Sequence, residues 1–216
     1  MDTSPIVAVA SSADDLEAVS ELLSALPADY SAAFVVVQHL ASGRERLLAE
    51  ALAKRTILPV MLAHDGVAAE QDHVYLIPAN NTLTMIGRRI RVTPNASKLH
   101  HPGDILFTSL AKERGAGAIG VVLSGGGSDG ALGTRAIRQG GGTTFAQYPG
   151  SARFPSMPIC AIETGCVSFV LRPNEIARAL TRLSRDAAPL AGVAGSVLVI
   201  DDKRNSAEAM ALQMRS

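Results

Sequence analysis

The sequence predicts an α/β protein: a doubly wound, mostly parallel sheet with helices on both faces and a small β-hairpin insertion. Three observations indicate this class. Continuous apolar runs, typical of strands buried on both faces, recur along the chain. Amphipathic helical patterns separate these runs. One stretch, residues 73–94, instead alternates apolar and polar residues between turn signals, which is typical of β-hairpins.

The first half of the chain opens with the run "PIVAVA", followed by an amphipathic pattern with Leu16, Val19, Leu22 and Leu23 on one face. The same alternation continues up to the hairpin stretch, where Asn80-Asn81 and Gly87-Arg88 supply turn chemistry. We expect strands at 5–10, 32–38 and 58–63, and helices at 14–26 and 44–55.

In the second half of the chain, predicted strands again alternate with predicted helices. Gly115 closes one predicted helix and Asn174 is the expected cap of the last one. The short run 168–171 is expected to be an edge strand. We expect helices at 104–115, 130–141, 156–165 and 174–185, and strands at 118–124, 142–147 and 168–171.

The composition changes after Arg185. Residues 186–196, "DAAPLAGVAGS", are small and poor in charge, which is typical of a linker. A strand in "VLVIDD" and a helix over 206–215 are expected to follow. One strand and one helix cannot bury a core alone, so the predicted organisation is a domain over 1–185 and the start of a second domain over 197–216.

Composition and charge exclude several function classes. Lysine plus arginine equals aspartate plus glutamate at 20 each, and tryptophan is absent, which argues against a nucleic-acid partner. No apolar run reaches the roughly 18 residues of a membrane span, and "MDTSP" lacks the pattern of a signal peptide. The sequence therefore predicts a cytoplasmic protein without membrane insertion.

Polar residues of the types used in acyl transfer follow three predicted strands. Ser11-Ser12 end the first strand, Gln38-His39 end the second, and "SGGGSDG", which contains Asp129, follows 118–123. In open α/β sheets such strand ends meet at one edge. A serine hydroxyl could attack there, with imidazole as base and carboxylate as its orienting partner. However, the G-x-S-x-G elbow of α/β-hydrolases is missing.

Each of these residues also has a structural alternative. Ser12 and Asp15 fit a capping box, His39 could be a satisfied, half-buried histidine, and Asp129 could cap a helix that starts near Gly130. The glycine run could cradle a phosphate, but the usual nucleotide motifs are missing. The remaining histidines lack metal-ligand spacing, the adjacent His100-His101 reads as solvated loop, and no metal site is expected.

Several blocks together resemble one family. "SADDLEAV", "AAFVVVQHL", "LPVMLAHDG", "HVYLIP", "AIGVVLSGGGSDGA", "GGTTFAQ" and "MPICAIETGCV" are similar in order and spacing to the catalytic domain of CheB-type protein-glutamate methylesterases, over about residues 5–182. That resemblance implies a bacterial enzyme of chemotaxis and two-component signalling. Such an enzyme hydrolyses γ-glutamyl methyl esters on chemoreceptors and deamidates certain receptor glutamines.

The resemblance also implies residue roles. Anchored on "LEA", the family's nucleophilic serine corresponds to Ser12, its general base to His39 and its orienting acid to Asp129. The backbone N–H groups of Ala13 and Gly126 are the implied oxyanion donors. No cofactor and no metal are implied, and the implied partner is a methylated chemoreceptor or another signalling protein.

The sequence departs from the family pattern beside the serine. Asp14 and Asp15 replace paired glycines, and a carboxylate near a developing oxyanion could cost on the order of 1–4 kcal/mol. The alternative function is therefore a weakened or inactive methylesterase fold that acts as a docking or sensing module in a multidomain signalling protein. The tail, with Asp201-Asp202, is similar to the first strand and helix of a response-regulator receiver domain, which implies a receiver and further domains in the full-length chain.

Overall fold

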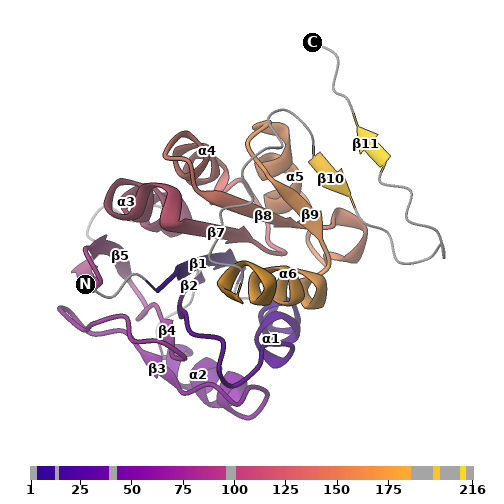
Figure 1. Cartoon of the computed structure of the whole chain (residues 1–216). Coiled ribbons are helices and arrows are strands. Elements are labelled where there is room, and N and C mark those ends of the chain that lie inside the picture. Colours follow the sequence, from indigo (N-terminus) through magenta and orange to yellow (C-terminus); the bar gives the residue numbers. More distant parts are fainter. Residues whose placement is uncertain are drawn as a thin grey trace.

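The computed structural model describes residues 4–12, 15–38, 43–95, 101–185, 197–199 and 210–212. Within these residues, one sheet has the strand order β11-β10-β9-β8-β7-β1-β2-β4-β3, and every neighbouring pair except β10–β11 is parallel (Figure 1). Its strands are β1 (Ile6–Ser11), β2 (Ala33–Gln38), β3 (Val60–Leu62), β4 (Val74–Leu76), β7 (Ala118–Val122), β8 (Thr143–Gln147), β9 (Phe169–Leu171), β10 (Val197–Val199) and β11 (Met210–Leu212).

Helices cover both faces of this sheet (Figure 1). On one face pack α1 (Leu16–Ser24), α2 (Glu45–Ala53) and α6 (Pro173–Arg185). On the other face pack α3 (Pro102–Arg114), α4 (Ala131–Gln139) and α5 (Ser156–Glu163). Two single-turn 3-10 helices, Gly115–Gly117 and Pro149–Ser151, lie in connections. The predicted fold class is confirmed.

Strand β1 shows why the apolar runs predict this sheet. All six of its residues are buried, with Val7 and Val9 in the core under α1 and α2 and Ala8 and Ala10 in the core under α3. A strand between two helical layers has no polar face, so its sequence is apolar throughout.

The hairpin insertion is a separate two-stranded sheet of β5 (Asn81–Ile86) and β6 (Arg89–Pro94). Gly87 turns between them with φ 59°. The hairpin lies against α3, where the Ser109 hydroxyl accepts the Met85 N–H at 3.0 Å and Glu113 accepts the Gly87 N–H at 2.7 Å. Asn80, by contrast, leads from β4 in the large sheet to the hairpin, so only Gly87-Arg88 forms a hairpin turn.

The C-terminal region corrects three expectations. Residues 210–212 form β11, antiparallel to β10, and not part of a helix over 206–215. Because β10 pairs with β9, the latter is not an edge strand. Helix α6 begins at Pro173, which places Asn174 inside its first turn and not at its cap. The linker 186–196 and Asp201-Asp202 lie outside the described residues, and the domain division stays a prediction.

None of the helices in the described ranges has the length and apolar character needed to cross a membrane.

Candidate active site

The site lies where the direction of the sheet's winding reverses. Strand β1 is flanked by β2 on one side and β7 on the other. The helix after β1, α1, and the helix after β7, α4, pack on opposite faces (Figure 1). A crevice between diverging connections is therefore expected at the carboxyl ends of β1 and β7, and this is the usual ligand position in such sheets.

The backbone of Ser12 ties three strand ends together. Its N–H donates to the carbonyl of Ser124, just after β7, at 3.0 Å. Its carbonyl accepts the side-chain amide of Gln38, the last residue of β2, at 3.1 Å and the N–H of Asp15 at 3.2 Å. These bonds fix the backbone of Ser12 at the end of β1.

The two adjacent serines differ in their environment. Ser11 is 3% exposed, and its hydroxyl oxygen accepts the amide of Gln38 at 2.7 Å. Ser12, by contrast, is half-buried at the edge of the sheet. Ser12 is therefore the serine of this pair that an external substrate can approach.

Asp15 has the role that the capping-box alternative gave to Ser12. Helix α1 begins at Leu16 and its N-cap is Asp15, whose carboxylate accepts the N–H of Ala18 at 3.3 Å. The capping box with Ser12 was wrong because the helix begins three residues later than that pattern requires. The buried Asp15 carboxylate lies at a helix N-terminus, where the helix dipole stabilises negative charge.

Asp129 caps a helix distant in sequence. Its carboxylate oxygens accept the backbone N–H groups of Gly103 and Asp104, both at 2.9 Å, at the start of α3. The N-cap of α4 is Gly130, with φ 88° and no side-chain cap. The alternative in which Asp129 caps the helix near Gly130 was therefore wrong, although Asp129 is a helix cap.

Close packing places Asp129 beside the end of β1. An ideal Cβ built on Gly103 would lie 2.8 Å from the Cβ of Ala10 and 3.0 Å from both carboxylate oxygens of Asp129. Ala10 is two residues before Ser12 in β1. The structure thus brings Asp129 and the strand that carries Ser12 to the same edge of the sheet.

Sequence reasoning missed His101 and Asp104. The Nδ1 atom of His101 lies 3.7 Å from Oδ2 of Asp104 and 3.9 Å from Oδ1 of Asp129. His101 is solvent-exposed, as expected, and it is also the N-cap residue of α3. The available signal was Pro102, because proline is favoured at the first position of a helix.

These three side chains could in principle hold a cation, since their ligand atoms lie within 4.8 Å of one another. Their carboxylates already have other partners, however. Asp129 accepts two N–H groups of α3, and Asp104 accepts the N–H of Gly133 at 2.8 Å. A helix N-terminus also disfavours positive charge. We therefore assign both carboxylates to capping and to joining α3 with α4.

The glycine loop after β7 packs against the backbone of Ser12. A Cβ on Gly125 would overlap the sulfur of Met157 and lie 3.1 Å from the Ser12 nitrogen, so a larger residue there would require the Met157 side chain to move. Gly126 is exposed, and among the described residues its N–H has no acceptor. An exposed N–H one residue from Gly125, which packs against the Ser12 nitrogen, is able to bind an oxyanion.

Two of the five predicted site residues, His39 and Ala13, lie outside the described residues, as does Asp14. Gln38 directly precedes His39 and pairs with Ser11 in the register of β1 and β2. The three described site residues, Ser12, Gly126 and Asp129, lie in connections at one edge of the sheet. These features define a doubly wound α/β protein with a serine-bearing site at its switch point.

Comparison with known proteins gives the family. The CheB methylesterase family model matches residues 7–180. A protein-glutamate methylesterase/protein-glutamine glutaminase 3 of Paramagnetospirillum magneticum is 36% identical over 182 residues, which cover 83% of this chain and 51% of that protein. A homologue of the same name from Anaeromyxobacter dehalogenans is 38% identical over 176 residues. The chain therefore belongs to the CheB methylesterase family.

A solved structure supports the same assignment. The crystal structure of the Thermotoga maritima CheB methylesterase catalytic domain superimposes with a TM-score of 0.77 at 27% identity, over 83% of this chain and 98% of that one. The chain spans about half the length of the curated methylesterases that it matches. An uncharacterized 104.1 kDa protein of Rhodobacter capsulatus is 42% identical over 125 residues, 13% of its length.

Proposed function

We propose that this protein is a protein-glutamate methylesterase that hydrolyses γ-glutamyl methyl esters on chemoreceptors or related signalling proteins, with glutamine deamidation as a second reaction. The observation that carries the proposal is the position of Ser12. It is half-buried at the switch point, its backbone is fixed by Gln38 and Ser124, and the chain is a CheB methylesterase family member.

The proposed reaction begins with attack of the Ser12 oxygen on the ester carbonyl carbon. His39 takes the hydroxyl proton as the new C–O bond forms, and the carbonyl oxygen becomes an oxyanion held by the N–H groups of Ala13 and Gly126. The intermediate collapses, the bond to methoxide breaks, and His39 returns the proton to release methanol. Water then cleaves the acyl-enzyme by the same route, giving a glutamate carboxylate and free Ser12.

Asp129 is the proposed partner of His39. Its carboxylate is buried and accepts two backbone N–H groups, which fix its orientation. A fixed carboxylate beside the end of β1 suits the task of orienting an imidazole. Deamidation would follow the same steps with ammonia as the leaving molecule.

The aspartates beside the serine motivate the alternative, a docking or sensing module without useful activity. One contact favours the esterase. Asp15 is buried and its carboxylate accepts the N–H of Ala18, so its charge is engaged by helix α1. A carboxylate held this way opposes an oxyanion less than one that points freely into the site.

Methanol release from a methylated receptor tests the proposal. We expect Ser12→Ala to abolish release, because its Oγ is the proposed nucleophile. Ser128→Ala is the matched control, since Ser128 is an exposed serine in the same glycine loop. Equal release by the wild type and Ser12→Ala would remove the proposal. No release by a folded wild type, restored by Asp14→Gly with Asp15→Gly, would favour the docking module.

A further inference from the structure

Two exposed apolar side chains flank the candidate site. Leu132, 66% exposed, lies in the first turn of α4, three residues after Asp129. Ile159, 38% exposed, lies in the first turn of α5, two residues after Met157, whose side chain covers Gly125. Helices α4 and α5 contact each other. Both side chains are therefore on the site's edge of the sheet, on helices that start at its loops.

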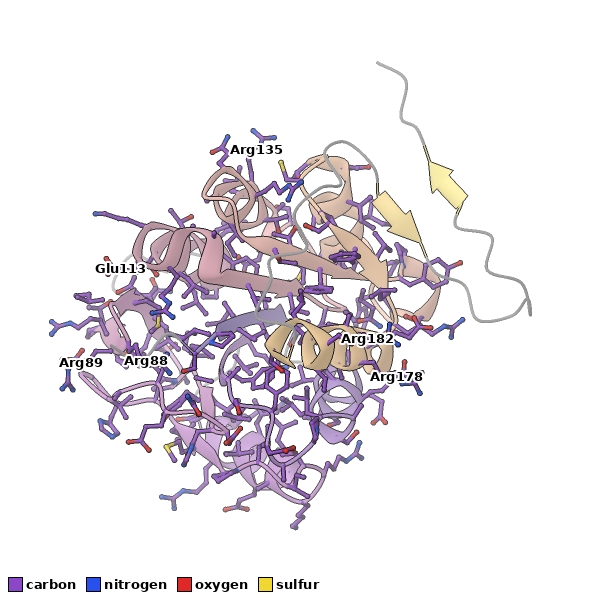
Figure 2. The ribbon with its side chains drawn as sticks, in the orientation of Figure 1. Arg88, Arg89, Glu113, Arg135, Arg178 and Arg182 are labelled. Carbon is purple, nitrogen blue, oxygen red and sulfur yellow. The ribbon has the colours of Figure 1, made fainter. Side chains whose placement is uncertain are left out.

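The same part of the chain carries charge of one sign. Between Gly130 and Ile162 there is no aspartate or glutamate, but there are three arginines, in a protein of net charge zero. Arg135 lies one turn after Leu132, is exposed, and makes no ion pair within the described residues. Figure 2 shows its side chain extending outward from α4.

A second cation belongs to this edge. The guanidinium of Arg153 lies over the ring of Phe154, 5.2 Å from its centroid. The carbonyl of Phe154 accepts the N–H of Gly125, and the Phe154 N–H donates to the Ser124 hydroxyl at 3.0 Å. Arg153 is thus attached, through Phe154, to the loop that binds Ser12.

We propose that Leu132, Arg135, Arg153 and Ile159, here called the basic rim, form a docking surface for an acidic amphipathic helix of the substrate protein. This rests on the proposed function. The apolar pair would contact the helix's apolar side, and the arginines its carboxylates, while the esterified side chain enters the site. Each turnover converts a neutral ester to a glutamate, so the substrate segment itself supplies carboxylates for the rim.

Other occupants fit this surface less well. Nucleic acid binding needs a larger set of phosphate contacts, usually with aromatic side chains on which bases stack, and here Phe154 is covered by Arg153. A membrane would need a broader apolar face than two side chains provide. Two exposed apolar side chains and two exposed arginines on neighbouring elements match a single helix with carboxylates along one side.

Steady-state kinetics on two substrates test the rim. One substrate is the methylated receptor, and the other is a small γ-glutamyl methyl ester that cannot reach the rim. We expect Leu132→Asp and Arg135→Glu each to raise KM for the receptor by about 10-fold or more, with small-ester kinetics unchanged. Ile57→Asp, at a site 68% exposed between α2 and β3 at the opposite edge of the sheet, and Arg178→Glu, exposed on α6, are the matched controls and should leave the kinetics on both substrates unchanged.

An unchanged receptor KM in both rim variants would overturn the docking surface. An equal fall in kcat/KM for the receptor and for the small ester would overturn it as well. If the wild type hydrolyses neither substrate, the proposed function fails and the rim is tested by binding alone. A fluorescent glutamate-rich amphipathic helix is then titrated with the wild type and Arg135→Glu. Weaker binding by the variant supports the surface, and equal affinity overturns it.

Discussion

Gly103 donates its backbone N–H to a carboxylate oxygen of Asp129 at 2.9 Å, and no larger residue fits at position 103 without displacing that carboxylate. This contact joins the start of α3 to the loop after β7. Asp129 caps α3, and it is also the proposed orienting partner of His39. The first is a feature of the structure and the second is part of the proposal, so variants can separate them.

Asp129→Asn changes both functions. An asparagine oxygen can accept one of the two N–H groups, but its NH2 then faces the other donor. We expect the free energy of unfolding to fall by about 1–3 kcal/mol, measured by urea denaturation. We expect methanol release to fall by about 10³-fold or more, because the imidazole loses its orienting charge.

Asp72→Asn is the control for this variant. The Asp72 carboxylate accepts the N–H of Ser31 at 2.7 Å in a loop connection on another part of the chain. This control should lose some stability and keep its activity. Full activity in Asp129→Asn would show that Asp129 is only a cap.

Gly103→Ala tests the close approach at the start of α3. The added Cβ would lie 2.8 Å from the Cβ of Ala10 and 3.0 Å from both oxygens of Asp129. Alanine favours helices, but this overpacking should dominate and lower the free energy of unfolding by about 1–3 kcal/mol. Gly117→Ala, with open space around its Cβ, should be nearly neutral in the same thermal or urea melts. An equal change in the free energy of unfolding in Gly103→Ala and Gly117→Ala would contradict the packing argument.

Gln38→Leu tests the fixation of Ser12. The Gln38 amide donates to the Ser11 hydroxyl oxygen and to the Ser12 carbonyl. Leucine keeps similar bulk and removes both bonds, so the backbone of Ser12 should be held less firmly. We expect kcat on a small ester to fall by about 10–100-fold with KM little changed, because misplacement of a nucleophile acts mainly on the chemical step. A change confined to KM would argue that Gln38 contacts the substrate instead.

Tyr30→Phe should change how stability depends on pH. Tyr30 is 1% exposed, and its hydroxyl has no hydrogen-bond partner among the described residues. Burial raises the pKa of Tyr30 far above its ordinary value of 10.0. The folded state therefore keeps the proton more tightly than the unfolded state, and this contribution is full below about pH 10 and is lost as the pH rises above it.

Unfolding curves at neutral pH and above pH 10 check this prediction. The wild type should lose about 1.4 kcal/mol per pH unit from this group in the alkaline range, and Tyr30→Phe should lack that loss. At pH 7 the variant should be as stable as the wild type or slightly more stable, because an unpaired buried hydroxyl is removed. If the free energy of unfolding fell equally with pH above pH 10 in the wild type and in Tyr30→Phe, the raised pKa of Tyr30 would be contradicted.

Much of the fold can be predicted from the sequence, because parallel strands that are buried on both faces consist of continuous runs of apolar residues. Val7 to Val9 and Phe34 to Val37 show this directly. Residues 210–212 were wrongly predicted to be helical, because Met210–Leu212 is an apolar run too short to distinguish a helix from a strand by periodicity. Pairing with β10, a tertiary contact, determines its strand conformation.

The site was only partly predictable. Chain order and family resemblance indicate Ser12 and Asp129, and the structure places both at one sheet edge. The bonds from Asp129 to Gly103 and Asp104 span more than twenty residues, so no local pattern could indicate them. His101 was missed for the same reason, since its nearness to Asp129 depends on how α3 packs beside α4.

The central claim is that Ser12, and not the neighbouring Ser11, forms the covalent bond to the substrate. Treatment of the folded protein with a serine-directed fluorophosphonate, followed by peptide mass spectrometry with fragmentation, tests it most directly. The account predicts one adduct on Ser12, which is absent after prior denaturation and slowed in Asp129→Asn. An adduct on Ser11, or no serine adduct in a protein that releases methanol, would contradict it.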